Sequence, residues 1–101
     1  TKPDITKVSV GVMVKRERGA CADVRISVGA VAPIIVRVHK AEDLLKGEPL
    51  KPSIIAEAAR LAYEDDVVRP ISDLRSTAEY RRSMVRVLVQ RALTNVLTNM
   101  N

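Results

Sequence analysis

Aromatic residues are almost missing from this chain, which has two tyrosines, no phenylalanine and no tryptophan among its 101 residues. Its core must therefore be aliphatic. The shortage of rings also leaves no platform on which unpaired bases could stack, which argues against single-stranded nucleic acid as a ligand. No apolar run approaches the roughly 18 residues that a membrane-spanning helix requires, so we expect no membrane contact.

Cysteine, histidine and glycine are scarce too, and their scarcity limits the chemistry. Cys21 is the single cysteine, which excludes an internal disulfide and predicts a reducing, cytoplasmic environment. Without an adjacent base it is interpreted as a small residue beside a turn. His39 is the only histidine and lacks a second ligand at metal-site spacing, so a surface position is predicted. The glycines are isolated and lack phosphate-loop spacing, so we expect no nucleotide pyrophosphate site of that type. With no base partner for Cys21 and no second ligand for His39, we also expect no complete active site, no catalytic residue and no metal site.

Three aspartates are the remaining candidates for a cation site. Asp65, Asp66 and Asp73 stand close together in the sequence, but no calcium-loop spacing surrounds them. We interpret the first two as solvated residues at a helix end. Asp73, together with Arg75, is predicted to fix the turn before the last helix.

The net charge is +5, which raises the question of a nucleic-acid partner. The basic residues are scattered, however, and carboxylates are interleaved with them along the whole chain. A mixed, solvated surface or an interface with an acidic partner explains this pattern better than a phosphate-binding patch.

The first third of the chain predicts three strands. Apolar and polar residues alternate over residues 7–15 and 23–30, which is the period of a strand with one buried face. Gly19 stands in the turn between them, so the two form a hairpin. After Pro33, residues 34–38 alternate again. The residues predicted to face the core are Val8, Val10, Val12, Val14, Val24, Ile26, Val28, Ala30, Ile34, Val36 and Val38.

The rest of the chain predicts three helices, over residues 41–46, 53–65 and 77–98. Gly47 ends the first, and the second shows the apolar spacing of a core-facing helix. Ser76 and Glu79 have capping-box spacing at the start of the third. The apolar stripe of that helix is predicted to comprise Met84, Val85, Leu88, Val89, Ala92, Leu93, Val96 and Leu97. The fold class is therefore α+β, a two-layer sandwich in which an antiparallel sheet of three or four strands carries the helices on one face.

Small residues gather on the other face of the predicted sheet. Ser9, Gly11, Ser27 and Gly29 alternate with the valines and leave this face smooth. Small side chains allow another backbone to approach closely. The alternatives at this point are a docking face and a face that is merely solvated.

The order of several short motifs resembles one known family. Asp-Ile-x-Lys-Val at residues 4–8 is followed by Asp-Val-Arg-Ile-Ser-Val-Gly at 23–29, Ala-Glu-x-Leu-Leu-x-Gly at 41–47 and Pro-Ile-Ser-Asp-Leu-Arg at 70–75. Glu-Tyr-Arg-Arg at 79–82 and a long apolar helix complete the series. Together they resemble the C-terminal domain of the FAD-binding (medium) subunit of molybdenum hydroxylases, the family of carbon monoxide dehydrogenase and xanthine dehydrogenase.

The resemblance implies that residues 1–101 are a single, non-catalytic domain of a flavoprotein subunit in an oxidoreductase. FAD would be bound mainly by domains upstream, and molybdopterin and [2Fe–2S] centres would lie in the large and small partner subunits. The resemblance places the segment with Asp4, Ile5 and Lys7 near the flavin. Two rival hypotheses stay open: a small basic RNA-binding module built on a three-stranded sheet, and a separately encoded scaffold for a flavin partner.

Overall fold

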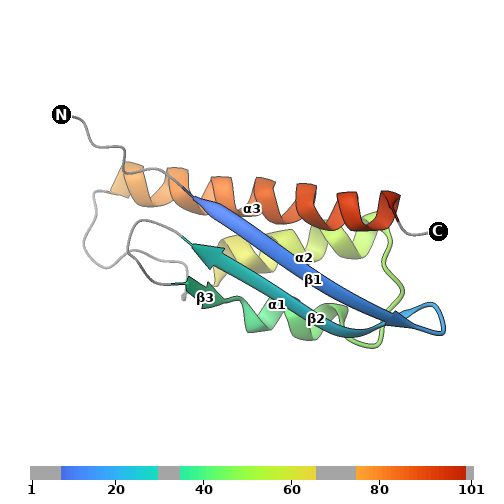
Figure 1. Cartoon of the computed structure of the whole chain (residues 1–101). Helices are drawn as coiled ribbons and strands as arrows, with labels where there is room; N and C mark the ends of the chain where they lie inside the picture. Colours follow the sequence, from blue (N-terminus) through green and yellow to red (C-terminus); the bar gives the residue numbers. More distant parts are fainter. Residues whose placement is uncertain (1–7, 30–34, 66–74, 100–101) are drawn as a thin grey trace.

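The computed structural model describes residues 8–29, 35–65 and 75–99. In chain order they form β1 (Ser9–Glu17), β2 (Ala20–Gly29), β3 (Ile35–Arg37), α1 (His39–Leu45), α2 (Pro52–Glu64) and α3 (Arg75–Thr98). The strands make one antiparallel sheet in the order β1-β2-β3, and the helices all lie behind it in Figure 1. The predicted α+β two-layer sandwich is confirmed, with three strands in the described part of the chain.

The β1–β2 hairpin is longer at its turn than the sequence pattern predicts. Arg18 and Gly19 both have positive φ, 56° and 82°, which is the geometry of a two-residue turn that matches the twist of a hairpin. The register places Val12 opposite Ile26 and shifts by a bulge between Lys15 and Arg16. The alternation of valines therefore determines which face of the sheet meets the helices.

The core lies between the sheet and the helices and is aliphatic, as predicted. Val24, Ile26 and Val28 of β2 are almost fully buried, as is Val38 at the start of α1. The valines of β1 are only half-buried, although they pack against the same core. The helices contribute a further buried apolar set, which comprises Ala41, Leu45, Ile55, Ala58, Ala59, Ala62, Val85, Val89 and Leu93. Cys21 of β2 and Leu50 between α1 and α2 are buried as well.

Two of the helices cover the sheet directly. α1 packs against β2 and α3 against β1, whereas α2 packs between α1 and α3. The one long helix, α3, begins at Arg75, so Ser76 lies inside the helix and the predicted N-cap position is wrong. Within the described ranges, no helix is both long and apolar enough to cross a membrane.

The predicted apolar stripe of α3 is only partly a core stripe. Val85, Val89 and Leu93 are buried, whereas Met84, Leu88 and Ala92 are half-buried. The two rows are neighbours on the helix surface because each follows i, i+4 spacing. The hydrophobic sequence of α3 therefore supplies one row to the core and a second row along its flank.

Several predicted features lie outside the described residues. They are Ala30, Pro33 and Ile34 of the third strand region, and Asp66, Pro70 and Asp73 before α3.

Candidate functional site: the open face of the sheet

One face of the sheet is left open by the helices. Ser9 and Gly11 on β1 are exposed, and Ser27 and Gly29 beside them on β2 are half-buried. A Cβ atom added at Gly11 would meet no atom within 4 Å, whereas one at Gly29 would lie 3.0 Å from Oγ of Ser9. The predicted cluster of small residues is therefore present, and it is most open at Gly11.

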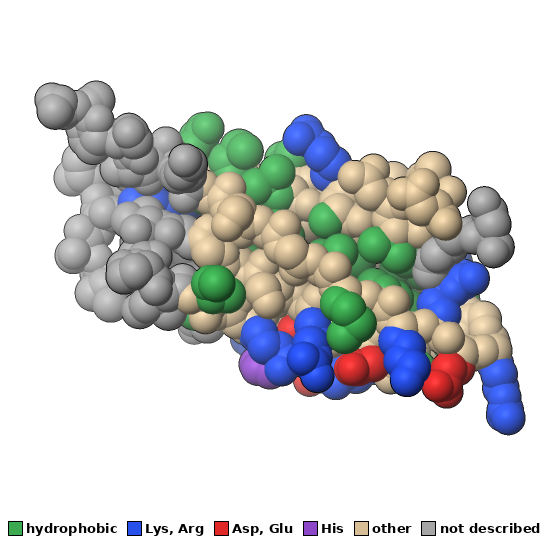
Figure 2. All heavy atoms as spheres, in the orientation of Figure 1, with side chains coloured by type: hydrophobic (Ala, Val, Ile, Leu, Met, Phe, Trp, Pro, Cys, Tyr) green, Lys and Arg blue, Asp and Glu red, His purple; other side chains and the backbone are tan. Residues whose placement is uncertain are grey.

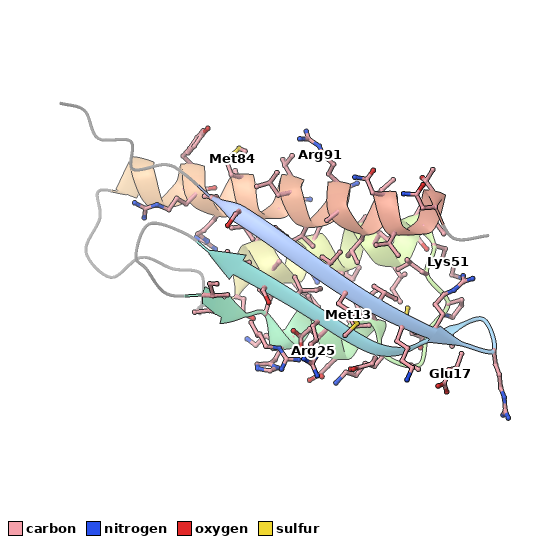
Figure 3. The ribbon with its side chains drawn as sticks, in the orientation of Figure 1. Met13, Glu17, Arg25, Lys51, Met84 and Arg91 are labelled. Carbon is pink, nitrogen blue, oxygen red and sulfur yellow. The ribbon has the colours of Figure 1, made fainter. Side chains whose placement is uncertain are left out.

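Two large apolar side chains share this face. Met13 is 41% exposed and lies on the near side of the sheet in Figure 3, and Ile35 on β3 is 73% exposed. The register pairs Ile35 with Gly29, so the two residues point to the same side. Sequence analysis considered only the small residues. The open face therefore carries two large apolar side chains in addition to the small residues.

The charges on this side of the molecule are mixed. Figure 2 shows Lys and Arg side chains along the lower rim, with Asp and Glu between them, and a centre of mostly backbone and small polar groups. Arg25, labelled in Figure 3, belongs to that rim. A uniform basic face, which the nucleic-acid alternative requires, is not what this view shows.

A buried carboxylate fixes the strand that borders the open face. Glu42 on α1 is fully buried, and its Oε2 accepts the backbone N–H of Ile26 at 2.8 Å. Arg37 on β3 donates to both carboxylate oxygens, at 3.0 and 2.8 Å. His39 Nδ1 lies 3.2 Å from Oε1. Glu42 therefore joins β2, β3 and α1 through one side chain.

The ionised form of Glu42 is favoured despite its burial. Burial by itself would raise the pKa of this carboxyl. The hydrogen bonds from Arg37 and Ile26, together with the charges of Arg37 and His39, outweigh that effect and bring the pKa below its ordinary value. Sequence analysis missed this role. The signal that identifies it is position, because Val38, Ala41, Glu42 and Leu45 have the i, i+3, i+4, i+7 spacing of a buried stripe.

Neither Cys21 nor His39, the two candidate reactive groups of the sequence, lies in a reactive setting. Cys21 is fully buried, and burial raises the pKa of its thiol, only partly offset by Arg16. Its backbone also accepts from Gly47 and donates to Glu48. His39 is exposed, as predicted, at the start of α1. Asp65 is buried at the C-cap of α2 rather than solvated, so that prediction is wrong.

A polar cluster joins α2 to the first half of α3. The hydroxyl of Tyr63 donates to Glu79, and the guanidinium of Arg82 stacks 4.5 Å from the Tyr63 ring centroid while its Nε donates to the Tyr63 carbonyl at 2.9 Å. The hydrogen bond to Glu79 raises the pKa of Tyr63, and burial and the Glu79 charge add to that rise. This cluster orients α3 against α2. Among the described residues, no group of three or more acidic, histidine or cysteine side chains could hold a metal ion.

Comparison with known proteins gives a consistent result at the level of both sequence and fold. Residues 1–96 match the family described as the CO dehydrogenase flavoprotein C-terminal domain. The chain is 38% identical over 90 residues to the nicotine 6-hydroxylase medium subunit of Paenarthrobacter nicotinovorans, covering 89% of this chain and 31% of that protein. It is 31% identical over 81 residues to the 6-hydroxypseudooxynicotine dehydrogenase complex subunit alpha of the same organism, covering 80% of this chain and 27% of that protein.

Solved structures show the same fold. A chain of the carbon monoxide dehydrogenase of Hydrogenophaga pseudoflava that lacks the Mo-pyranopterin moiety superposes with a TM-score of 0.77 at 28% identity, over 93% of this chain and 32% of that one. The quinoline 2-oxidoreductase of Pseudomonas putida 86 gives a TM-score of 0.74 at 28% identity, over 90% of this chain and 31% of that one.

The chain is thus an α+β domain of the flavoprotein type found in oxidoreductases of this class. It belongs to the family of CO dehydrogenase flavoprotein C-terminal domains, which confirms the resemblance read from the sequence. The chain spans about a third of the length of the relatives it matches.

The family is one of flavoproteins, so FAD is the cofactor that it implies. Gly19 and Gly47 have positive φ and serve turns. Gly11 lies on the open face, where an added Cβ would meet no atom within 4 Å, and the corresponding space at Gly29 is taken by the hydroxyl of Ser9. Among the described glycines, none stands at a helix N-terminus, which is a common place for a bound phosphate. Asp4, Ile5 and Lys7, expected near the flavin, lie outside the described residues.

Proposed function

We propose that this chain is the non-catalytic C-terminal domain of the FAD-binding medium subunit of a molybdenum-containing oxidoreductase of the CO dehydrogenase type. It would support the flavin-binding domains and the contacts between subunits. The observation that carries the proposal is the open face, where small residues and exposed Met13 and Ile35 lie on a sheet whose other face packs against the helices.

The role of the domain in this proposal is mechanical. Electron transfer belongs to FAD held by the preceding domains, with molybdopterin and [2Fe–2S] centres in the large and small partner subunits. The domain contributes a rigid surface, because Glu42 ties α1 to the sheet and the Tyr63–Arg82 cluster ties α3 to α2. A rigid neighbour holds a cofactor domain in one geometry, which is what a protein adds to cofactor chemistry.

Asp4, Ile5 and Lys7 are assigned to the flavin side of the domain. The support is their match to the family motif and their place in the sequence directly before β1, whose Ser9 and Gly11 begin the open face. We propose that this segment and the open face together meet the flavin-binding part of the subunit.

The test is a pair of substitutions at Gly11. Gly11→Ala keeps the side chain small, whereas Gly11→Leu fills the space where another backbone would approach; because nothing lies within 4 Å of that position, both variants of the 101-residue chain should fold. In the complete subunit, Gly11→Leu should reduce the flavin bound per subunit and Gly11→Ala should not, since overpacking a close contact costs about 1–3 kcal/mol. Normal flavin content and activity in the Gly11→Leu subunit would show that the face is merely solvated.

A further inference from the structure

The edge of β1 is open along its whole length in the described part of the chain. The sheet order places β1 at one side, with β2 as its only neighbour. The N–H of Ile26 donates to Glu42 and its carbonyl accepts from Val38, so both backbone groups of Ile26 point away from β1. Val12, opposite Ile26, is then in a non-hydrogen-bonded pair, and its own N–H and carbonyl point outward.

The same geometry repeats every second residue. The backbone groups of Val10, Val12 and Val14 therefore form a row of donors and acceptors along this side, which we call the β1 edge. Natural edge strands are usually protected by charges, prolines or bulges. Here the bulge and the charges Lys15 and Arg16 stand at one end, and the segment from Ser9 to Val14 has none of these features.

Helix α3 extends beyond this edge. Besides α2, it packs against β1, the edge strand of the sheet, and a helix about 10 Å wide underlies roughly two strands spaced about 4.8 Å apart. On one flank of its buried row, Arg82 and Arg86 reach the Tyr63 ring of α2. Met84, Leu88 and Ala92, here called the α3 ridge, lie on the other flank, away from α2 and therefore beyond β1.

The α3 ridge is an apolar surface that no other described element covers completely. Its three side chains are half-buried, and neither Met84 nor Leu88 is among the described side chains that pack against the core. Figure 3 shows Met84 pointing away from the body of the molecule, and Figure 2 shows hydrophobic side chains gathered along this side of α3. An open row of backbone groups thus borders an unused apolar row.

We propose that the β1 edge and the α3 ridge accept a fourth β-strand, supplied by the polypeptide that precedes this domain in the same subunit. This rests on the proposed function, because it assigns the strand to the flavin-binding part. Its backbone would pair with Val10, Val12 and Val14, and alternate apolar side chains would cover Leu88 and its neighbours. The outer side chains of such a strand would extend the open face next to Gly11.

The choice of occupant follows from geometry and connectivity. A second copy paired edge to edge about a twofold axis would place two α3 helices beneath adjacent strands about 4.8 Å apart, whereas packed helices need about 8–10 Å between their axes. The relatives are about three times longer than the chain, and the matched family is a C-terminal domain, so in them most of the polypeptide precedes the region that aligns with this chain. A tethered strand also binds at a high effective concentration.

Amide hydrogen exchange at single residues tests the proposal directly. In the 101-residue chain, the amides of Val10 and Val12 should exchange quickly, while those of Gly11 and Met13, which face β2, should be protected. In the complete subunit, exchange at Val10 and Val12 should slow by more than about tenfold. Fast exchange at both valines in the complete subunit would overturn the proposal, as would protection that arises only when partner subunits bind.

Two variants on α3 provide the matched comparison. Leu88→Glu places a charge on the α3 ridge and should abolish most of the added protection at Val12 in the complete subunit. Val87→Glu changes the adjacent residue, which is already 43% exposed, and should leave that protection unchanged. Equal effects of the two variants would contradict the assignment of the ridge.

The Gly11→Leu subunit separates this proposal from the proposed function. Normal flavin content with protected Val10 and Val12 would remove the docking role of the open face and leave the fourth strand standing. Reduced flavin content with fast exchange at Val10 and Val12 would support the docking role of the open face and overturn the fourth strand.

Discussion

The N–H of Ile26 and the carboxylate of Glu42 form a hydrogen bond of 2.8 Å that continues the β2–β3 ladder by means of a side chain. β3 ends at Arg37, and the chain turns into α1 two residues later. Without Glu42, the N–H of the fully buried Ile26 would have no acceptor, because β3 ends before it reaches this position. A glutamate one turn into the helix satisfies it and anchors the helix at the same time.

Removal of this carboxylate should weaken the fold. Glu42→Ala leaves the buried N–H of Ile26 without its acceptor, which typically costs about 1–3 kcal/mol of unfolding free energy. The measurement is urea denaturation of the variant beside Asp43→Ala, which alters the neighbouring, exposed carboxylate and should change stability by less than about 0.5 kcal/mol. Equal stability of the two variants would show that the hydrogen bond contributes nothing.

Stability should also fall in acid because of Glu42. Its pKa is lower in the folded chain than the ordinary value of about 4.3, so its contribution is complete above that pH and is lost as the pH falls through the folded-state pKa. Glu42→Gln should therefore flatten the dependence of the melting temperature on pH in this acidic range. A variant whose pH profile runs parallel to that of the wild type would contradict the assignment.

Buried and exposed positions of α3 should respond differently to truncation. Leu93→Ala empties a fully buried position and should cost about 2–5 kcal/mol. Val87→Ala, at an exposed position on the same helix, should cost under about 0.5 kcal/mol. Chemical denaturation of both variants decides the matter, and a large loss at Val87 would mean that α3 is rotated relative to the described packing.

Cys21 should be unreactive in the folded chain. Its side chain is buried, and burial raises the pKa of the thiol, so neither access nor thiolate is available near neutral pH. Alkylation by iodoacetamide should be more than about a hundredfold slower in buffer than in denaturing urea, because reaction requires opening of the core. Rapid labelling of the native chain would instead show an accessible thiol.

The sheet could be predicted from the sequence because its residues obey a local rule. Alternating valines in β1 and β2 have one arrangement that buries them, and Gly19 marks the turn that joins these two runs. The same rule placed Ser9, Gly11, Ser27 and Gly29 together on the opposite face. Successive side chains of a strand point to opposite faces, so the face of each residue follows from its position in the sequence alone.

The residues that prediction missed depend on neighbours that are distant in the sequence. The carboxylate of Glu42 cannot be told from the other charges of a mixed surface by sequence, because its partners, Ile26 and Arg37, belong to other elements. Leu88 was placed in the core because a helical stripe does not reveal how wide the covered surface is. In the fold, α3 packs beneath the edge strand β1, so only one of its two apolar rows is buried against the core.

The backbone bonds at Cys21 have a consequence for the order of folding. Cys21 donates to the carbonyl of Glu48 at 2.9 Å and accepts the N–H of Gly47 at 2.8 Å, so the chain from β2 to the end of α1 is closed on itself. Short loops lose less entropy on closure than long ones, which favours this unit and the adjoining hairpin as early structures. The contacts of α3 with β1 join opposite ends of the chain and should form last. During synthesis the valines of β1 would remain uncovered until α3 has left the ribosome, which is the interval in which this protein most needs protection from aggregation.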